Sequence, residues 1–154
     1  TRYLNVTTVG LPARTLLRVD VLVEWTYPRA PTEKVPSDTM VIVLHAPKVS
    51  TEVTDPVQVA RIVRWFDALP VSPPGIAVMC PLGVPPDITL SFRNARGAWL
   101  AQAKLPPTLA TICESIAVSI GGRDQKPLVD RAHSESFVHR LQQLVGVQLI
   151  RISR

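Results

Sequence analysis

Apolar and polar side chains alternate along the stretch LLRVDVLVEW, from Leu16 to Trp25. Successive side chains of a β-strand point to opposite faces, so a period of two predicts a strand here. One side of that strand carries only apolar residues, namely Leu17, Val19, Val21, Val23 and Trp25. We therefore expect a strand whose apolar face is covered by other parts of the protein and whose opposite face meets water.

The strongest helix signal lies between Thr54 and Pro70, in the stretch TDPVQVARIVRWFDALP. Thr54 or Asp55 can cap the first turn, and Pro56 suits that turn because its missing N–H would have no partner there. Pro70 predicts the end of the helix. The buried side is predicted from an apolar stripe at helical spacing: Val59, Ile62, Val63, Phe66 and Leu69.

A second helix is predicted closer to the C-terminal end of the chain. Ser134 can cap its first turn, and Gly146 is a typical residue just past the end of a helix. Helical spacing places three apolar residues on the inward side: Phe137, Leu141 and Leu144.

Strand patterns fill the segments around these two helices. Met40–His45 is apolar on both sides up to its histidine, which is typical of a strand near the centre of a sheet. Shorter strands are predicted at Ile76–Met79, Ser115–Ile120 and Val147–Ile152.

The stretch Asp87–Lys104 predicts a hairpin with its turn at Asn94–Gly97. The expected register pairs Arg93 with Ala98, so that Phe92 lies opposite Trp99 on the covered face. Leu90 then faces Ala101 and Ile88 faces Ala103 on that same side.

Neighbouring strands joined by short turns indicate an α+β fold, with a mainly antiparallel sheet and two helices packed on one of its faces. The length of 154 residues suits one domain with a core of its own, and no linker or repeat divides the chain. We therefore expect a single domain over residues 1–154.

The net charge of +5 raises the question of a nucleic-acid partner. The 17 lysines and arginines are dispersed without a run of three, and three Trp, two Tyr and three Phe are too few for a base-stacking surface. Nucleic acid is thus a poor candidate. Diffuse attraction to an anionic surface favours an unknown protein or a cell-envelope polymer as partner.

No apolar run approaches the ~18–20 residues that a membrane-spanning helix needs. Peripheral or lipid-anchored association with a membrane stays open. The chain begins at Thr1 and contains no stretch like a signal peptide, so we expect a trimmed or processed form.

The chain has two cysteines, Cys80 in a proline-rich connection and Cys113 before a predicted strand. Both lie at strand ends, which antiparallel strands can bring together, so we expect a Cys80–Cys113 disulfide; two separate buried thiols are the alternative. Neither a paired C-x-x-C nor a C-x-x-H is present, so no metal site or other cofactor is expected. Such a bond would place the protein outside the reducing cytosol.

No catalytic or nucleotide-binding motif occurs in the sequence. An unrecognised hydrolase remains an alternative, in which His45 would act with a nearby carboxylate such as Glu24 or Asp20. A further alternative is an inhibitor-like module that presents the proline-rich loop Tyr27–Asp38, which we expect to be long and exposed.

The stretch Asp55–Val145 also carries a recognisable order of features. A helix ending in LP is followed by Cys80–Pro81, the hairpin DITLSFRNARGAWLA, a second cysteine, a strand ending in IGG, and a closing helix. This order resembles small secreted or lipid-anchored domains of Gram-positive bacteria, uncharacterised in function. The resemblance implies an extracytoplasmic location and a disulfide, and it transfers no catalytic residue.

The sequence therefore favours a secreted or cell-envelope domain with a binding or structural role. A face of the sheet or the long loop would recognise its partner.

Overall fold

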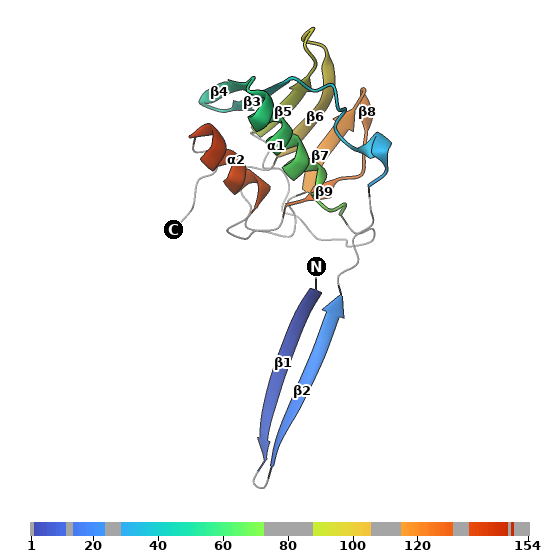
Figure 1. Ribbon diagram of the computed structural model, residues 1–154, viewed down its shortest axis with the longest axis vertical. Coiled ribbons are helices and arrows are strands. Elements are labelled where there is room, and N and C mark those ends of the chain that lie inside the picture. The colour runs from blue at the N-terminus through green and yellow to red at the C-terminus, as the bar shows by residue number, and fades with distance from the viewer. Residues whose placement is uncertain are drawn as a thin grey trace.

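The computed structural model describes residues 2–11, 14–23, 29–72, 88–105, 115–130, 136–147 and 149 of the chain. Within these residues the strands form two sheets. The two helices and the mostly antiparallel larger sheet confirm the predicted α+β fold (Figure 1).

The larger sheet has the strand order β4-β3-β5-β6-β7-β8, and β9 pairs with β7 beside this path. All of its pairings are antiparallel. The strands are β3 (Val41–Ala46), β4 (Val49–Val53), β5 (Ile88–Arg93), β6 (Trp99–Leu105), β7 (Ser115–Ile120), β8 (Arg123–Asp124) and β9 (Leu128–Val129). The expected central strand at Met40–His45 is β3, which lies between β4 and β5.

Helix α1 (Pro56–Asp67) confirms the first predicted helix. The Asp55 carboxylate accepts a hydrogen bond from the Gln58 N–H at 2.8 Å and so caps the first turn. Val59, Ile62 and Phe66 are buried, as the apolar stripe predicted.

Helix α2 (Phe137–Val145) confirms the second predicted helix, but its cap is Ser136 and not Ser134. The Ser136 hydroxyl accepts a hydrogen bond from the His139 N–H at 3.1 Å. Either serine suits a cap, and the tertiary position of the first turn selects between them. Gly146 ends the helix with φ +68°, a conformation that favours glycine.

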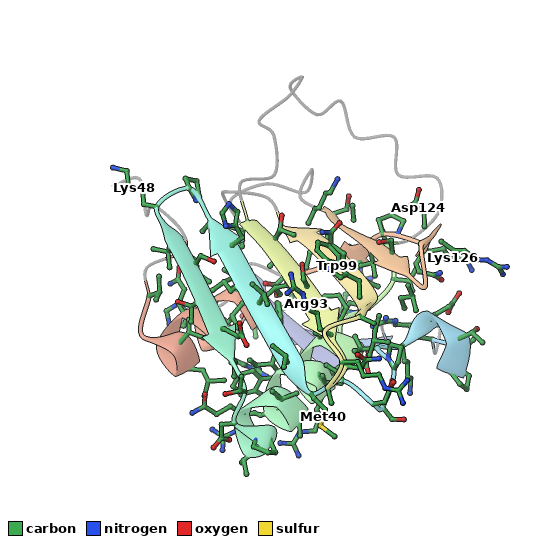
Figure 2. All side chains as sticks on the ribbon, turned by 90° about the horizontal axis from the view of Figure 1, so that it is seen from above. Met40, Lys48, Arg93, Trp99, Asp124 and Lys126 are labelled. Carbon is green, nitrogen blue, oxygen red and sulfur yellow. The ribbon has the colours of Figure 1, made fainter. Side chains whose placement is uncertain are left out.

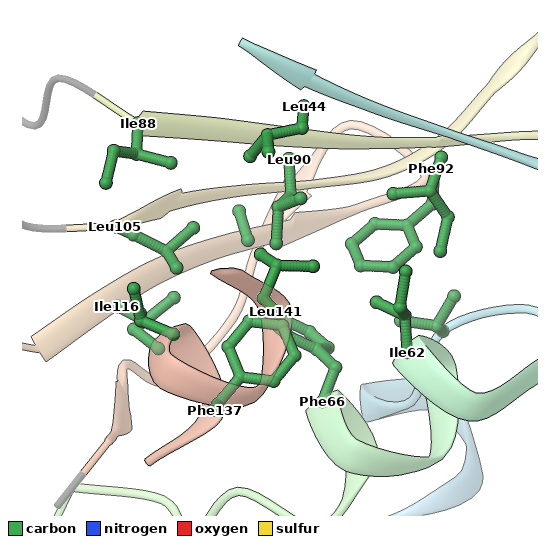
Figure 3. Packing of buried hydrophobic residues seen from close by; sticks show 14 of the residues in the cluster. Leu44, Ile62, Phe66, Ile88, Leu90, Phe92, Leu105, Ile116, Phe137 and Leu141 are labelled. Carbon is green, nitrogen blue, oxygen red and sulfur yellow. The ribbon is translucent and has the colours of Figure 1, made fainter. Parts of the chain in front are cut away.

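Both helices pack on one face of the larger sheet and share one core with it, as predicted (Figure 1, Figure 3). The Phe66 ring of α1 lies at the centre of this core. Its centroid is 5.2 Å from that of Phe92 on β5 and 5.6 Å from that of Phe137 on α2. The two helices therefore contact the sheet and each other through one aromatic cluster.

The predicted register of the β5–β6 hairpin is wrong. Arg93 pairs with Trp99, and Phe92 pairs with Ala101, because the register shifts by one residue between Phe92 and Arg93. The turn is also one residue longer than predicted, so Arg93 pairs with Trp99 and not with Ala98. In this turn the Asn94 N–H donates to the Ala98 carbonyl, and Gly97 adopts φ +79°. Trp99 consequently leaves the covered face and is 58% exposed.

Strands β1 (Arg2–Leu11) and β2 (Arg14–Val23) form a two-stranded antiparallel sheet of their own (Figure 1). The alternation at Leu16–Trp25 correctly predicted β2, but the expected cover of its apolar face is wrong at Leu17 and Val19. Leu17 is 65% exposed and Val19 is 50% exposed, as is Val6 on the neighbouring strand. Alternation reports which side is apolar; whether anything packs on that side depends on the tertiary structure.

Two other predicted strands cannot be placed. Ile76–Met79 lies outside the described residues. Of Val147–Ile152, the structure describes only Val147 and Leu149, neither of them in a strand. Leu149 is buried, and its N–H donates to the Gln142 side chain at 2.9 Å. The expectation of one domain over residues 1–154 stays a prediction.

Candidate functional site

The helix-free face of the larger sheet is the first candidate surface. The pairing register aligns a row of outward residues across six strands, and a second row runs beside it. The first row consists of Glu52, Val43, Ser91, Gln102, Ser119 and Asp124. The second consists of Ser50, His45, Thr89, Lys104 and Ala117. All of these residues except Val43 and Ala117 are polar or charged, and Ser91 is buried, so the other polar side chains offer hydrogen-bond donors and acceptors on this face.

Trp99 is the one large aromatic residue among the described residues of this face. The Arg93 guanidinium lies over its ring, 5.0 Å from the ring centroid, and the two residues are paired across β5 and β6 (Figure 2). The Arg93 Nε is buried without a hydrogen-bond partner in the described part of the chain. The guanidinium is therefore positioned by the indole ring, which makes a cation–π contact.

His45 lies on the same face, exposed at the end of β3. Among the described residues no carboxylate forms a hydrogen bond or ion pair with its ring. Asp20 belongs to the separate β1–β2 sheet, and Glu24 lies outside the described residues. Within the described residues, His45 thus has no carboxylate partner of the kind that the hydrolase alternative requires.

A second candidate surface lies on the helix side, where the segment from Lys34 to Met40 runs beside α1. Together they enclose a groove of about 590 Å³. Its apolar lining consists of Pro36, Met40, Pro56, Val59, Ala60, Val63 and Ala68, and its polar lining consists of Lys34, Ser37, Thr39, Arg64 and Asp67. Met40 is 52% exposed at its edge, close to α1 (Figure 2).

Arg29 fixes this segment against α1. Its side chain is only 4% exposed, and its guanidinium donates to the Phe66 carbonyl at 3.1 Å and to the Glu33 carbonyl. It also lies 3.7 Å from the Asp67 carboxylate. Burial lowers the pKa of Arg29 from its usual value, against the opposing attraction of Asp67 and Glu33. The guanidinium thus joins the Glu33 carbonyl of the loop to the Phe66 carbonyl at the C-terminal end of α1, where cations are favoured.

Asp67 joins the loop to the helix from the other side. Its carboxylate accepts a hydrogen bond from the Val35 N–H at 3.0 Å. Burial raises the pKa of Asp67, while this hydrogen bond and Arg29 oppose the rise. Where it is described, the loop Tyr27–Asp38 is largely exposed, as expected, but the Arg29 side chain and Val35 are buried against α1.

A buried carboxylate, Asp130, performs a structural task near α2. Its two oxygens accept hydrogen bonds from the Phe137 N–H at 2.8 Å and the Val138 N–H at 3.0 Å. Burial raises the pKa of Asp130, and the two hydrogen bonds and Arg140 act against that rise. A perturbed carboxyl can indicate catalysis, but this one is occupied by the first turn of a helix.

Cys80 and Cys113, the predicted disulfide partners, both lie outside the described residues. The described part of the chain contains no cluster of three metal-ligating side chains. It also contains no helix long and apolar enough to cross a membrane.

Sequence reasoning missed both surfaces in their detail. The predicted register buries Trp99, and the long turn after Arg93 is the local feature that could have indicated a different register. The groove joins residues some twenty to thirty positions apart, which no local pattern links. No family model, curated protein or solved structure was found to match the chain.

Proposed function

We propose that this chain is a secreted or cell-envelope binding module that attaches to an anionic envelope polymer through the helix-free face of its sheet. The observation that carries the proposal is the exposed Trp99 ring, which lies beside the cationic Arg93 on the mostly polar, helix-free face of the sheet. An exposed aromatic ring can stack on a sugar ring, and the neighbouring hydroxyl and amide groups can bind sugar hydroxyls.

Charge supports an anionic ligand for this surface. Arg93 and Lys104 lie on the inner strands β5 and β6, whereas Glu52 and Asp124 lie on the outer strands β4 and β8. The middle of the face is therefore cationic, in keeping with the net charge of +5. A polymer with phosphate or carboxylate groups would lie across the strands, with its anionic groups over the centre.

Cosedimentation with purified bacterial cell walls, with and without their anionic polymers, tests this function. The wild type should sediment with intact walls, and binding should decrease with added salt because exposed charges are screened. Trp99→Ala should weaken binding up to about tenfold, the equivalent of ~1.4 kcal/mol of stacking. Val57→Ala, which removes exposed apolar surface from α1, is the matched control and should bind as the wild type does.

Equal binding of Trp99→Ala and wild type would show that the sheet face is not the contact surface. Binding that is retained on walls stripped of anionic polymer and in high salt would exclude the anionic ligand. Sedimentation with neither preparation would remove the envelope-polymer function altogether.

The extracytoplasmic location rests on the expected disulfide between Cys80 and Cys113, since such bonds rarely persist in the cytosol. The non-reduced protein should be lighter than the reduced protein by two hydrogen atoms, and it should resist thiol labelling until it is reduced. Intact-mass measurement of protein kept under oxidising conditions checks both results. Two freely labelled thiols under those conditions would contradict the disulfide and remove this argument for the location.

A further inference from the structure

The groove beside α1 lies on the helix side of the sheet, so it is a surface separate from the Trp99 face. We propose that it binds an extended acidic peptide segment of a partner protein, whose apolar side chains enter the groove. This inference does not depend on the polymer-binding function.

The shape of the surface favours an extended chain. A second hollow of about 570 Å³ lies beside the first, and Pro56, Ala60 and Arg64 line both of them. These three residues are four positions apart, so they form a ridge along one side of α1. Ala60, at the middle of the ridge, has the smallest side chain of the three. A peptide crossing the ridge at Ala60 can place one apolar side chain in each hollow.

The floor and edges of the groove suit apolar side chains. Val59 is buried beneath the groove, and Val63 packs against the core beside it. Two exposed residues extend the apolar surface beyond the floor, since Met40 is 52% exposed and Val57 is 66% exposed. Apolar side chains of a ligand would therefore meet apolar groups on the floor and at both margins.

The groove exists before any ligand arrives. The Thr39 hydroxyl donates to the Pro36 carbonyl at 2.8 Å, and the Met40 N–H donates to the Arg93 carbonyl at 2.8 Å. With the buried contacts of Arg29 and Asp67, these bonds hold both ends of the Lys34–Met40 segment. A preformed site loses less conformational entropy on binding, which favours a peptide ligand.

The charges around the groove select for an acidic ligand. Lys34, Arg61 and Arg64 are exposed along its edges. Among the described residues that line the two hollows, Asp67 is the one carboxylate against these three basic side chains, and it lies 3.7 Å from Arg29. The rim is therefore net positive, and carboxylates that flank the apolar residues of a peptide would complement it.

Selection of a random twelve-residue peptide library on the folded protein tests the proposal. We expect enrichment of peptides that combine apolar residues with Asp or Glu, and their affinities can be measured by fluorescence anisotropy. Ala60→Trp places a large side chain on the ridge between the two hollows and blocks the path of the peptide, and Arg64→Glu reverses the charge at the rim. Each variant should weaken binding at least about tenfold. Gln143→Trp on the exposed side of α2 is the matched control and should leave binding unchanged.

Arg64→Glu keeps the test decisive if Ala60→Trp fails to fold, because Arg64 is exposed on α1. Failure to enrich any peptide family would overturn the proposal. So would enriched peptides that are basic, or that bind both groove variants as tightly as the wild type.

Discussion

Replacing Phe66 by alanine should lower the free energy of unfolding by about 3–5 kcal/mol. The Phe66 side chain is fully buried between sheet and helices, and its ring contacts both Phe92 and Phe137 (Figure 3). Alanine would leave a cavity where α1, α2 and β5 meet, so it would remove transfer free energy and dispersion contacts together. Chemical denaturation monitored by circular dichroism measures the change.

Val57→Ala serves as the control for this experiment. It lies on the same helix, but its side chain is 66% exposed, so truncation should change stability by no more than about 0.5 kcal/mol. A Phe66→Ala protein as stable as the wild type would contradict the central position of this ring in the core.

Replacing Asp130 by alanine should cost roughly 2–4 kcal/mol, because it leaves two buried backbone donors without partners. Phe137 and Val138 are 3% and 0% exposed, and the Asp130 carboxylate accepts from both of their N–H groups. Hydrogen exchange of these two amides should accelerate more than exchange in α1. Asp130→Asn should be milder, since the amide keeps one acceptor oxygen.

Ser136→Ala provides the comparison for Asp130. It removes a single cap bond, to the His139 N–H, and should cost about 0.5–2 kcal/mol. Asp130→Ala could instead lower the free energy of unfolding no more than Ser136→Ala does, with the Phe137 and Val138 amides still protected from exchange. That result would contradict the role of the Asp130 carboxylate as acceptor for both amides.

The same carboxyl gives a pH dependence with a defined sign. Burial raises the pKa of Asp130 in the folded protein above the ordinary 3.8, so the folded state holds this proton more tightly than the unfolded state does. Protonation of Asp130 therefore adds stability that is fully present below the ordinary value and is lost as pH rises through the raised pKa, while the hydrogen bonds from the Phe137 and Val138 N–H groups remain. A carboxyl carbon titration by NMR should show a midpoint above 3.8; a midpoint at or below it would contradict this direction.

Local signals in the sequence determined the secondary structure around the core. Asp55, Pro56 and the apolar stripe of α1 act within a few residues of one another, so the helix and its buried side followed from them directly. The same holds for Gly146 at the end of α2, where only local backbone geometry matters. Together with the alternating strands, these signals were sufficient for the α+β class.

Register and exposure required the tertiary structure. The shift between Phe92 and Arg93 arises from how β5 and β6 pair, and it moves Trp99 from the predicted core to the open face. The apolar side of β2 likewise reads as a buried face, although Leu17 is exposed in the folded chain. A pattern defines the two sides of a strand, but only packing decides which side meets another element.

The two candidate surfaces depend on contacts between distant segments. Arg29 is thirty-seven positions from Phe66, yet their hydrogen bond helps to hold the loop that forms one wall of the groove. The same limit applies to His45 and the carboxylates proposed as its partners, Asp20 and Glu24. Their spacing in the sequence does not determine whether they lie close together in the folded protein. The sequence by itself thus determined the two helices, the strands β2, β3, β5, β6 and β7, and the fold class, because these follow from local backbone preferences and periodic burial. The tertiary structure alone decided the surfaces, because they are made where segments far apart in the chain come together.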